Sequence, residues 1–179
     1  MSNLWRGRGT AHVLGDNVPH DGGVINFRFI PLRITDPNEL IPHLFDEVDP
    51  TLKTRLKPGD FIVAGDNFCC GKAHTQGLIA LKALNIRILC QSMPYRSFRA
   101  ATGLALAAMV QCDGITSFVR DGDEIDVDFA TGEVVRLADG ERRTYPGIAP
   151  DIRTMIEEGG MKGLLAKHLR EHPELAEAY

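Results

Sequence analysis

The stretch of residues 65–84, GDNFCCGKAHTQGLIALKAL, most constrains the fold of this chain. It follows a short apolar run, FIVA, whose residues favour a buried strand. From Leu78 onward apolar residues recur at helical spacing, with Lys82 on the opposite side. The unit therefore predicts a strand, a polar turn containing Gly71, and a helix. Free backbone N–H groups at such a turn, together with the helix dipole, form a site suited to an anion.

The rest of the chain predicts strands that alternate with helices. We expect strands at residues 9–14, 61–65, 86–90 and 109–112, helices at 35–49, 78–84 and after a turn at 92–94, and a hairpin at 121–137. Pro42 should make the first helix irregular. This order predicts an α/β fold with mixed strand directions. We expect one domain, residues 1–179, that ends in a helical tail at about 150–179 with a break at a Gly-Gly pair.

Composition excludes several classes of function. The 179 residues carry a formal net charge of −4, whereas proteins that bind nucleic acids or membrane surfaces in a general way are basic. No apolar run approaches the roughly 20 residues of a membrane-spanning helix, and residues 1–16 lack the apolar core of an export signal. We therefore expect a cytoplasmic protein with neither nucleic-acid nor membrane partners.

The four cysteines predict free thiols rather than a metal site. They are Cys69, Cys70, Cys90 and Cys112, and no two of them have C-x-x-C spacing. Adjacent side chains such as those of Cys69 and Cys70 rarely converge on one metal ion. We expect no metal ligand in this chain. Cys70 stands at the start of a helix, close in sequence to His74, so a nucleophilic cysteine with a lowered pKa is one alternative for the chemistry.

Two motifs resemble known ligand loops but lack their spacing. A phosphate-binding loop has four residues between its glycines and Ser or Thr after its lysine. Here five residues separate Gly65 from Gly71, and Ala73 follows Lys72. The acidic residues around Asp126 lack the spacing and the closing Glu of a calcium loop. We therefore expect no nucleotide hydrolysis, and we expect these acidic residues to form the solvent-exposed face of the hairpin.

Two segments outside the central stretch carry candidate ligand-binding residues. The loop after the first strand and the segment that follows it contain His20, Asp21 and Arg28. This loop is either a plain polar connection or a surface that presents these residues to a ligand. Arg96 and Arg99 lie near the start of a predicted helix, where cations oppose the helix dipole. These two arginines are either solvated or directed at an anion.

Four segments in the correct order give the chain a family resemblance. GDNFCCGKAHTQ resembles the G-[DE]-N-F-G-C-G-S-S-R-E-H motif of the 3-isopropylmalate dehydratase small subunit, the swivelling domain of the aconitase superfamily. DNVPHDGGVI resembles the D-N-[IV]-D-T-D-x-I-I loop of that family, and SMPYRSFRAA resembles its S-F-x-x-I-F-x-R-N-A segment. GDEIDVDFATGEV is similar to its G-D-x-[IV]-x-[IV]-D-x-x-T-G segment. The resemblance covers nearly the whole chain.

The resemblance implies a swivelling β/β/α domain of the aconitase C-terminal type. It implies a hydro-lyase subunit, with a role in leucine biosynthesis, that dehydrates and hydrates a small hydroxy-dicarboxylic acid. In the family a separate large subunit holds a [4Fe–4S] cluster. The swivelling domain closes over that site and supplies a serine base and an arginine for a substrate carboxylate. This chain should therefore bind no cofactor itself and show no dehydratase activity without its large, cluster-binding partner.

The departures from the family pattern fall in the reactive motif. Lys72 stands in place of the catalytic serine, Ala73 in place of the second serine, and His74 in place of the arginine. We expect Lys72 and His74 to be catalytic. A partly desolvated lysine can take a proton or bind a carboxylate, and the histidine can bind the same anion or act as an acid. Gly71 and Ala73 should contact the substrate at the turn.

The resemblance also assigns substrate-binding residues outside the motif. His20 and Asp21 occupy the T-D positions of the early loop, Arg28 lies beside the basic position of the family, and Arg99 matches the family arginine. The changed motif leaves the substrate open, as 3-isopropylmalate or a different hydroxy acid. Two further alternatives are a non-catalytic or regulatory paralogue that kept the fold, and an independent enzyme that uses Cys70.

Overall fold

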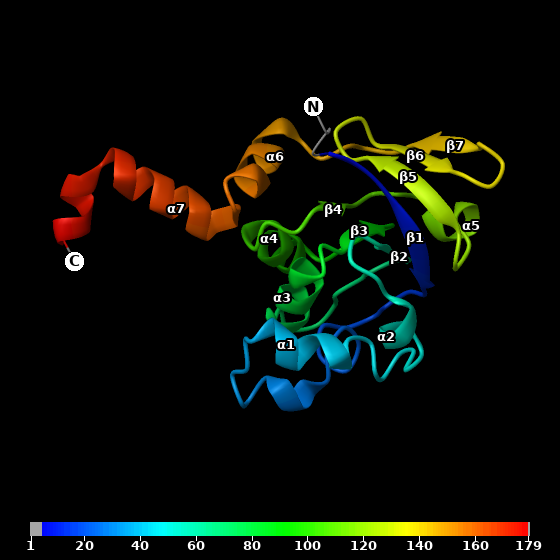
Figure 1. The fold of residues 1–179 in the computed structure, drawn as a ribbon, viewed down its shortest axis with the longest axis horizontal. Helices are drawn as coiled ribbons and strands as arrows, with labels where there is room; N and C mark the ends of the chain where they lie inside the picture. Colours follow the sequence, from blue (N-terminus) through cyan, green and yellow to red (C-terminus); the bar gives the residue numbers. More distant parts are fainter. Residues whose placement is uncertain (1–4, 179) are drawn as a thin grey trace.

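The computed structural model describes residues 5–178, with the side chains of residues 5–175. Residues 1–4, which belong to the segment where we expect no export signal, lie outside the described residues, as does Tyr179 at the end of the predicted tail. The strands are β1 (Arg6–Leu14), β2 (Phe61–Ala64), β3 (Arg87–Cys90), β4 (Ala108–Met109), β5 (Glu124–Asp128), β6 (Glu133–Arg136) and β7 (Arg142–Thr144). They form a sheet in the order β4-β3-β2-β1-β5-β6-β7 (Figure 1).

Strand β1 joins a parallel half of the sheet to an antiparallel half. Its residues 6–10 pair antiparallel with β5, and its residues 11–14 pair parallel with β2. Strands β3 and β4 continue the parallel half, whereas β6 and β7 continue the antiparallel half. The predicted mixture of strand directions is confirmed. Because parallel strands end at the same edge of a sheet, the loops after β1, β2 and β3 meet there.

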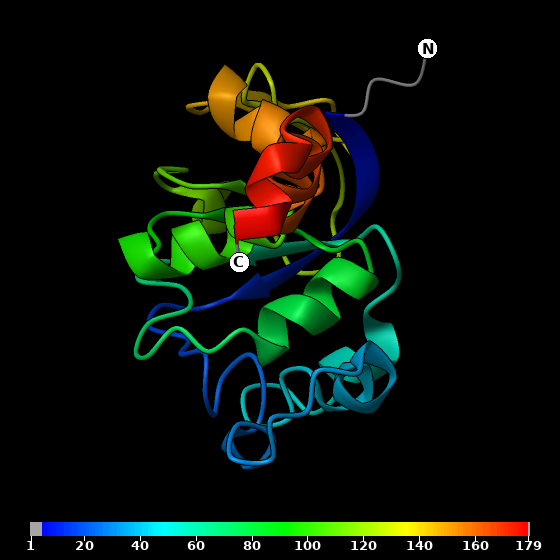
Figure 2. The same cartoon turned by 90° about the vertical axis from the view of Figure 1, so that its left-hand side faces the viewer.

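The helices are α1 (Pro37–Leu40), α2 (Leu52–Arg55), α3 (Gln76–Ala83), α4 (Tyr95–Gly103), α5 (Ile115–Phe118), α6 (Pro150–Glu157) and α7 (Gly160–Glu171). Alternate residues of β2 supply two core clusters, one on each face of the sheet. Ile62 and Ala64 belong to the cluster under α3 and α4, and Phe61 and Val63 to the cluster under α5 and the hairpin. Figure 2 shows α3 between α1 and the strands.

Several predicted elements differ in extent from the observed ones. The helix expected at 35–49 is confirmed as irregular: α1 gives way to a 3₁₀ turn, Ile41–His43, which contains Pro42. The helical segment ends there instead of continuing to residue 49. The strand expected at 109–112 is the two-residue β4, which overlaps it only at Met109. Helices α2 and α5 and strand β7 were not predicted.

The hairpin of β5 and β6 is confirmed, but the prediction of an exposed acidic face is wrong for Asp126. This side chain is buried, and its residue is 3% exposed. Its carboxylate accepts hydrogen bonds from Arg6 Nε at 2.8 Å and from Arg8 Nε at 2.7 Å. The neighbouring strand β1 carries both arginines, whose side chains cover the carboxylate and neutralise its charge.

The C-terminal helical segment is broken at a glycine pair, as predicted. Gly159, which precedes α7, and Gly160, its first residue, have φ values of 87° and 78°. A Cβ atom at Gly160 would lie 2.2 Å from the Gly103 carbonyl oxygen, so this close approach of α7 to α4 requires glycine. Helix α7 then extends away from the sheet (Figure 1).

The division of the chain into one domain with a tail at about 150–179 stays a prediction. None of the helices within residues 5–178 combines the length and the apolar character needed to span a membrane.

Candidate functional site

Three loops come together at the edge where β1, β2 and β3 end. The first loop runs beside the central motif and is tied to it by backbone hydrogen bonds from His20 N to Cys70 O at 3.0 Å and from Cys70 N to Val18 O at 3.3 Å. The loop after β3 is tied to the motif by a bond from Phe68 N to Ser92 O at 3.0 Å. These bonds fix the relative positions of side chains that are far apart in the sequence.

The central motif turns sharply before α3. Asn67, Cys69 and Gly71 have φ values of 57°, 58° and 84°, in the left-handed region that favours glycine. Asn67 Nδ2 donates to Asn17 Oδ1 at 2.9 Å, which holds the first of these residues. The turn leaves Gly71 and Lys72 exposed at the surface of the molecule. It therefore presents an accessible ammonium group at the position where the family pattern has serine.

His74 forms a close pair with Asp21. The distance from His74 Nδ1 to Asp21 Oδ2 is 2.6 Å, and the two side chains are 22% and 19% exposed. Because a carboxylate only accepts, Nδ1 is the donor, and Nε2 carries the lone pair when the ring is neutral. No hydrogen-bond partner of Nε2 occurs within the described part of the chain. The arrangement holds the ring at one nitrogen and leaves the other free for a substrate.

His20 belongs to a second, buried set of hydrogen bonds behind this pair. His20 Nε2 lies 3.0 Å from Ser97 Oγ, and Ser97 Oγ donates to the Cys69 carbonyl oxygen at 2.6 Å. The hydroxyl therefore accepts from Nε2–H, and the buried Nδ1 has no partner among the described residues. In the family pattern these three positions are Thr, Phe and Gly. The exchanged side chains of His20 and Ser97 thus contact each other, while Cys69 takes part through its backbone carbonyl.

Burial lowers the pKa of His20 to about 4, with the neighbouring Asp21 carboxylate opposing the shift and His74 adding to it. His20 is accordingly neutral at physiological pH. A neutral, buried ring that donates to Ser97 positions the loop and does not carry protons for the reaction. His20 was predicted to bind substrate, and this geometry favours a supporting role beneath the Asp21–His74 pair.

A groove beside the motif connects it with the C-terminal helices. Its volume is about 530 Å³, and its lining includes Ala73, Tyr95, Arg96, Arg99, Met155 and Met161. The guanidinium of Arg99 lies over the Tyr95 ring, 5.5 Å from its centroid. The structure thus brings Ala73 and Arg99, two predicted substrate-binding residues, to one groove. Apolar side chains from α4, α6 and α7 form much of the rest.

No protein-family model matches this chain. A 3-isopropylmalate dehydratase small subunit from Thermodesulfovibrio yellowstonii is 31% identical over 163 residues, which are 90% of this chain and 95% of that protein. This chain belongs to the 3-isopropylmalate dehydratase small-subunit family. The isopropylmalate/citramalate isomerase small subunit of Methanocaldococcus jannaschii is 31% identical over 165 residues, or 92% and 96% of the two chains. The 2,3-dimethylmalate dehydratase small subunit of Eubacterium barkeri is 29% identical over 157 residues, or 87% and 94%.

A solved structure supports the same assignment. The crystal structure of 3-isopropylmalate dehydratase from Methanocaldococcus jannaschii matches this small subunit with a TM-score of 0.83 and 30% identity, over 94% of this chain and 98% of that one. The predicted family, the aconitase-type fold class and the classification as a hydro-lyase subunit are confirmed. The site residues are not tested by these comparisons and stay predictions.

Two predicted residues of the small subunit have their contacts elsewhere. Arg28 is exposed, with Nη2 at 3.1 Å from His43 Nδ1 and its guanidinium over the Phe29 ring. Among the described residues it makes no hydrogen bond to the Asp21–His74 pair. Cys70 Sγ donates to the Asn17 carbonyl oxygen at 3.5 Å, and no bond to His74 accompanies it within residues 5–178. The geometry therefore gives no support to a Cys70–His74 nucleophile.

Ser97 is a site residue that the sequence analysis missed. It stands at a position where the family pattern has Phe, so the polar residue at this position was the available signal.

The described part of the small subunit holds no group of three or more His, Cys, Asp or Glu side chains that could bind a metal ion. Its cysteines Cys69, Cys90 and Cys112 are buried free thiols, and burial raises the pKa of each. An iron–sulfur cluster does not fit these residues, because cluster ligands are grouped thiolates.

Proposed function

We propose that this small subunit serves a hydro-lyase acting on a small hydroxy-dicarboxylic acid, with His74 moving the proton. The observation that carries this proposal is the 2.6 Å hydrogen bond between His74 Nδ1 and Asp21 Oδ2, at the place where the family pattern has its reactive serine and arginine. A carboxylate that holds one ring nitrogen orients the other for proton transfer. Histidine is also the side chain best suited to exchange a proton near neutral pH.

Lys72 and Arg99 supply the positive charges that a dicarboxylate requires. Lys72 is exposed two residues before His74, and its ammonium has no hydrogen-bond partner among the described residues. Arg99 lines the groove that also contains Ala73. We assign Lys72 to one substrate carboxylate and Arg99 to the other, while free N–H groups at the Gly71 turn add to the anion site.

The hydrogen bonds made by the exchanged residues favour a working site over a decayed one. His20, Ser97 and the Cys69 carbonyl form one hydrogen-bonded chain, and Asp21 and His74 form another pair. The hydrogen bond between two exchanged side chains, His20 and Ser97, and the bond from the exchanged His74 to the retained Asp21 support retained chemistry on an altered substrate.

We further propose that a separate large subunit binds this chain and holds the [4Fe–4S] cluster. The relatives are named small subunits of isopropylmalate dehydratase, isopropylmalate/citramalate isomerase and dimethylmalate dehydratase. A protein named a small subunit implies a larger partner subunit, which supports this part of the proposal. The hydroxy acids in those names define the substrate range that we propose. We also propose a cytoplasmic location, since free thiols fit a reducing compartment.

The test is copurification of this chain with the cluster-binding large subunit of the same genome, followed by assay. The substrates are 3-isopropylmalate, citramalate and 2,3-dimethylmalate. We expect turnover of at least one of them, and we expect Lys72→Met to raise its KM about tenfold or more by removing a carboxylate contact. Lys162→Met, at an exposed position of α7, is the matched control and should change neither constant. A stable complex that turns over none of the three acids would support the regulatory paralogue.

A further inference from the structure

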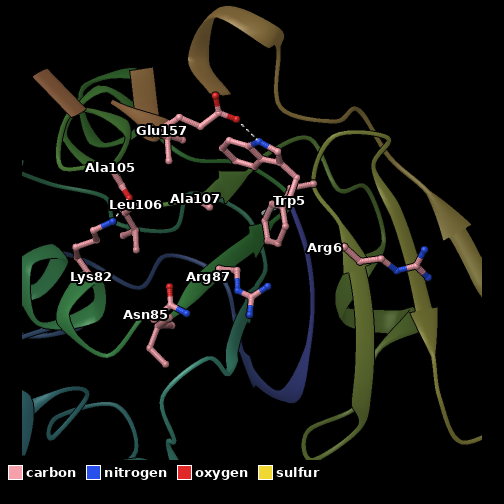
Figure 3. A pocket seen from close by; sticks show the side chains of 12 residues that line it. Trp5, Arg6, Lys82, Asn85, Arg87, Ala105, Leu106, Ala107 and Glu157 are labelled. Atoms are coloured by element: carbon pink, nitrogen blue, oxygen red, sulfur yellow. Dashed lines mark hydrogen bonds between the residues drawn. The ribbon is translucent and has the colours of Figure 1, made fainter. Parts of the chain in front are cut away.

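A second cavity lies at the opposite end of the parallel strands from His74. It has a volume of about 370 Å³ and is bordered by the end of α3, the beginnings of β3 and β4, and the end of α6. Figure 3 shows Lys82, Asn85 and Arg87 on one side of it and Trp5 and Glu157 on the other. None of the residues predicted for the catalytic site lines this rear cavity.

Two cations of the rear cavity have no carboxylate partner within residues 5–178. Arg87 Nη2 donates to the Gly59 carbonyl oxygen at 3.3 Å, and the buried Arg87 Nε has no hydrogen-bond partner among the described residues. Lys82 Nζ donates to the Ala105 carbonyl oxygen at 2.6 Å. Burial lowers the pKa of both side chains. A ligand anion would offset this cost by supplying the missing negative charge.

The local structure holds the Arg87 guanidinium in place. It lies over the Phe61 ring, 4.8 Å from its centroid. Position 7 of β1 is glycine, and a Cβ atom there would lie 1.6 Å from Arg87 Nη1. Glycine at this position therefore leaves the space that the guanidinium occupies. A positioned, partly buried arginine with an unpaired N–H group is typical of carboxylate recognition.

The remaining walls of the rear cavity are aromatic and aliphatic. Trp5, Phe129 and Leu106 are buried side chains that line it. Trp5 Nε1 donates to Glu157 Oε1 at 2.6 Å, which fixes the indole on the wall across from Arg87 (Figure 3). Apolar walls with a few positioned polar groups are the usual composition of small-molecule sites.

We propose that the rear cavity binds a small monocarboxylate with a hydrocarbon body. The carboxylate lies at Arg87 and Lys82, and the hydrocarbon packs against Trp5, Phe129 and Leu106. The ligand would also contact α6, because Ile156 of that helix lines the rear cavity. The adjacent residue, Met155, lines the groove beside Ala73. This proposal does not depend on the proposed function, since none of the residues assigned to the catalytic site lines the rear cavity.

The test uses the single tryptophan of the chain, which lines the cavity. The full-length protein is titrated with 4-methylpentanoate and, as a neutral isostere, with 4-methylpentanamide, while tryptophan emission is followed. We expect a saturable change with the acid and binding weaker by about tenfold or more with the amide. Arg87→Gln and Lys82→Met should each weaken binding of the acid about tenfold, whereas Lys162→Gln on α7 should leave it unchanged.

Thermal unfolding without ligand identifies any variant that fails to fold. Lys82 is an exposed residue in the last turn of α3, so we expect Lys82→Met to fold. This variant therefore tests the proposal even if Arg87→Gln is unstable. Absence of a saturable response to 4-methylpentanoate would overturn the proposal. Equal binding of acid and amide, or wild-type binding by the folded cation variants, would overturn it as well.

Discussion

His74 and Asp21 are 53 residues apart in the chain, yet their side chains meet at 2.6 Å. The contact exists because the loop after β1 is hydrogen-bonded to the motif after β2. At the level of single residues, a histidine held by a carboxylate stands where the family pattern has its arginine. The exposed Lys72 adds a cation two positions earlier. This combination can bind an anion and transfer a proton at one point of the surface.

Replacement of Asp21 tests whether it orients His74. Asp21→Asn keeps the size of the side chain but removes the charge that holds Nδ1–H. We expect kcat of the reconstituted enzyme to fall about 10- to 100-fold. The same substitution made in a His74→Gln background should cause no further loss, because the two residues act as a unit. Additive losses in the double variant would show that Asp21 acts independently of His74.

His20 makes stability depend on pH in a defined direction. Its pKa is about 4 in the folded protein, because the ring is buried, and 6.5 is its ordinary value. The unfolded chain therefore binds the proton first, and stability falls as the pH drops from about 6.5 toward 4. The full loss from this residue corresponds to about 3 kcal/mol below pH 4.

Urea denaturation between pH 4 and pH 7 measures this effect. The free energy of unfolding should fall about 3 kcal/mol less over that range in His20→Gln than in the wild type. His168→Gln, at an exposed position of α7, is the control and should behave as the wild type does. Equal pH dependence of wild type and His20→Gln would contradict the assignment of His20 as a neutral, buried ring.

The sequence could indicate part of the site but not its internal contacts. The departures from the family motif drew attention to Lys72 and His74, which lie at the expected turn. The role of Ser97 depends on a hydrogen bond to His20 across two loops, and no local pattern encodes that contact. Arg28 was expected near the substrate by its neighbouring position in the family pattern. Its exposed side chain contacts His43 instead.

At the level of secondary structure, strand β1 controls the register of the sheet. It carries Arg6 and Arg8, whose side chains both bond to Asp126 of β5. Burial raises the pKa of Asp126, but the hydrogen bonds from the two arginines outweigh this effect and the pKa is lowered. The alternation of the hairpin sequence predicted exposure for this residue, since it could not show that a distant strand covers that face.

Loss of the Asp126 charge should destabilise the β1–β5 pairing. Asp126→Asn is expected to lower the free energy of unfolding by about 2 kcal/mol at pH 7, because two charged hydrogen bonds are weakened. A carboxyl with a lowered pKa stabilises the fold above its unfolded pKa and loses that effect as the pH falls. The difference between wild type and variant should therefore shrink below about pH 4.

Chemical denaturation at pH 7 and pH 3 checks this expectation. Glu124→Gln is the matched control on the same strand, because its carboxylate accepts only an exposed bond from Thr10. It should cost less than about 1 kcal/mol. A cost for Asp126→Asn that equals that of Glu124→Gln would show that the buried ion pair has no special weight.

Elements with strong local patterns were predicted well, and those fixed by tertiary contacts were not. Strands β2 and β3 and helix α3 have clear apolar patterns and lie where they were expected. Strand β7 consists of exposed residues, Arg142–Thr144, that have no apolar pattern. Their extended conformation goes with pairing to β6, a contact that the local sequence does not indicate. The short helices α2 and α5 each span four residues, too few for a periodic signal.

At the level of the whole molecule, the parallel half of the sheet separates two cavities of different character. One end carries the Asp21–His74 pair and the groove with Arg99, and the other carries the rear cavity with Arg87. Helix α6 borders both cavities through neighbouring residues. In our proposals, the first end faces the substrate and the large subunit, and the rear cavity takes a separate small ligand.

The isolated chain should have no dehydratase activity. Within the part of the chain that the structure describes, the proposed Asp21–His74 pair and the cations are present, but no group of three or more metal-binding side chains could hold a metal that activates a hydroxyl leaving group. Purified chain assayed alone on the three hydroxy acids should give only the background rate, and addition of the large subunit should restore turnover. Activity of the chain alone that is abolished by thiol alkylation would favour an independent enzyme that uses Cys70.

The role of His74 is tested most directly by kcat of the reconstituted enzyme with the wild-type chain and with His74→Gln. Glutamine keeps a polar side chain at this position but cannot exchange a proton, so kcat should fall about 100-fold or more. His43→Gln, outside the site, should retain the wild-type value, and copurification should show that both variants still bind the large subunit. A kcat for His74→Gln equal to that of the wild type would contradict the assignment of His74 as the proton-transferring residue.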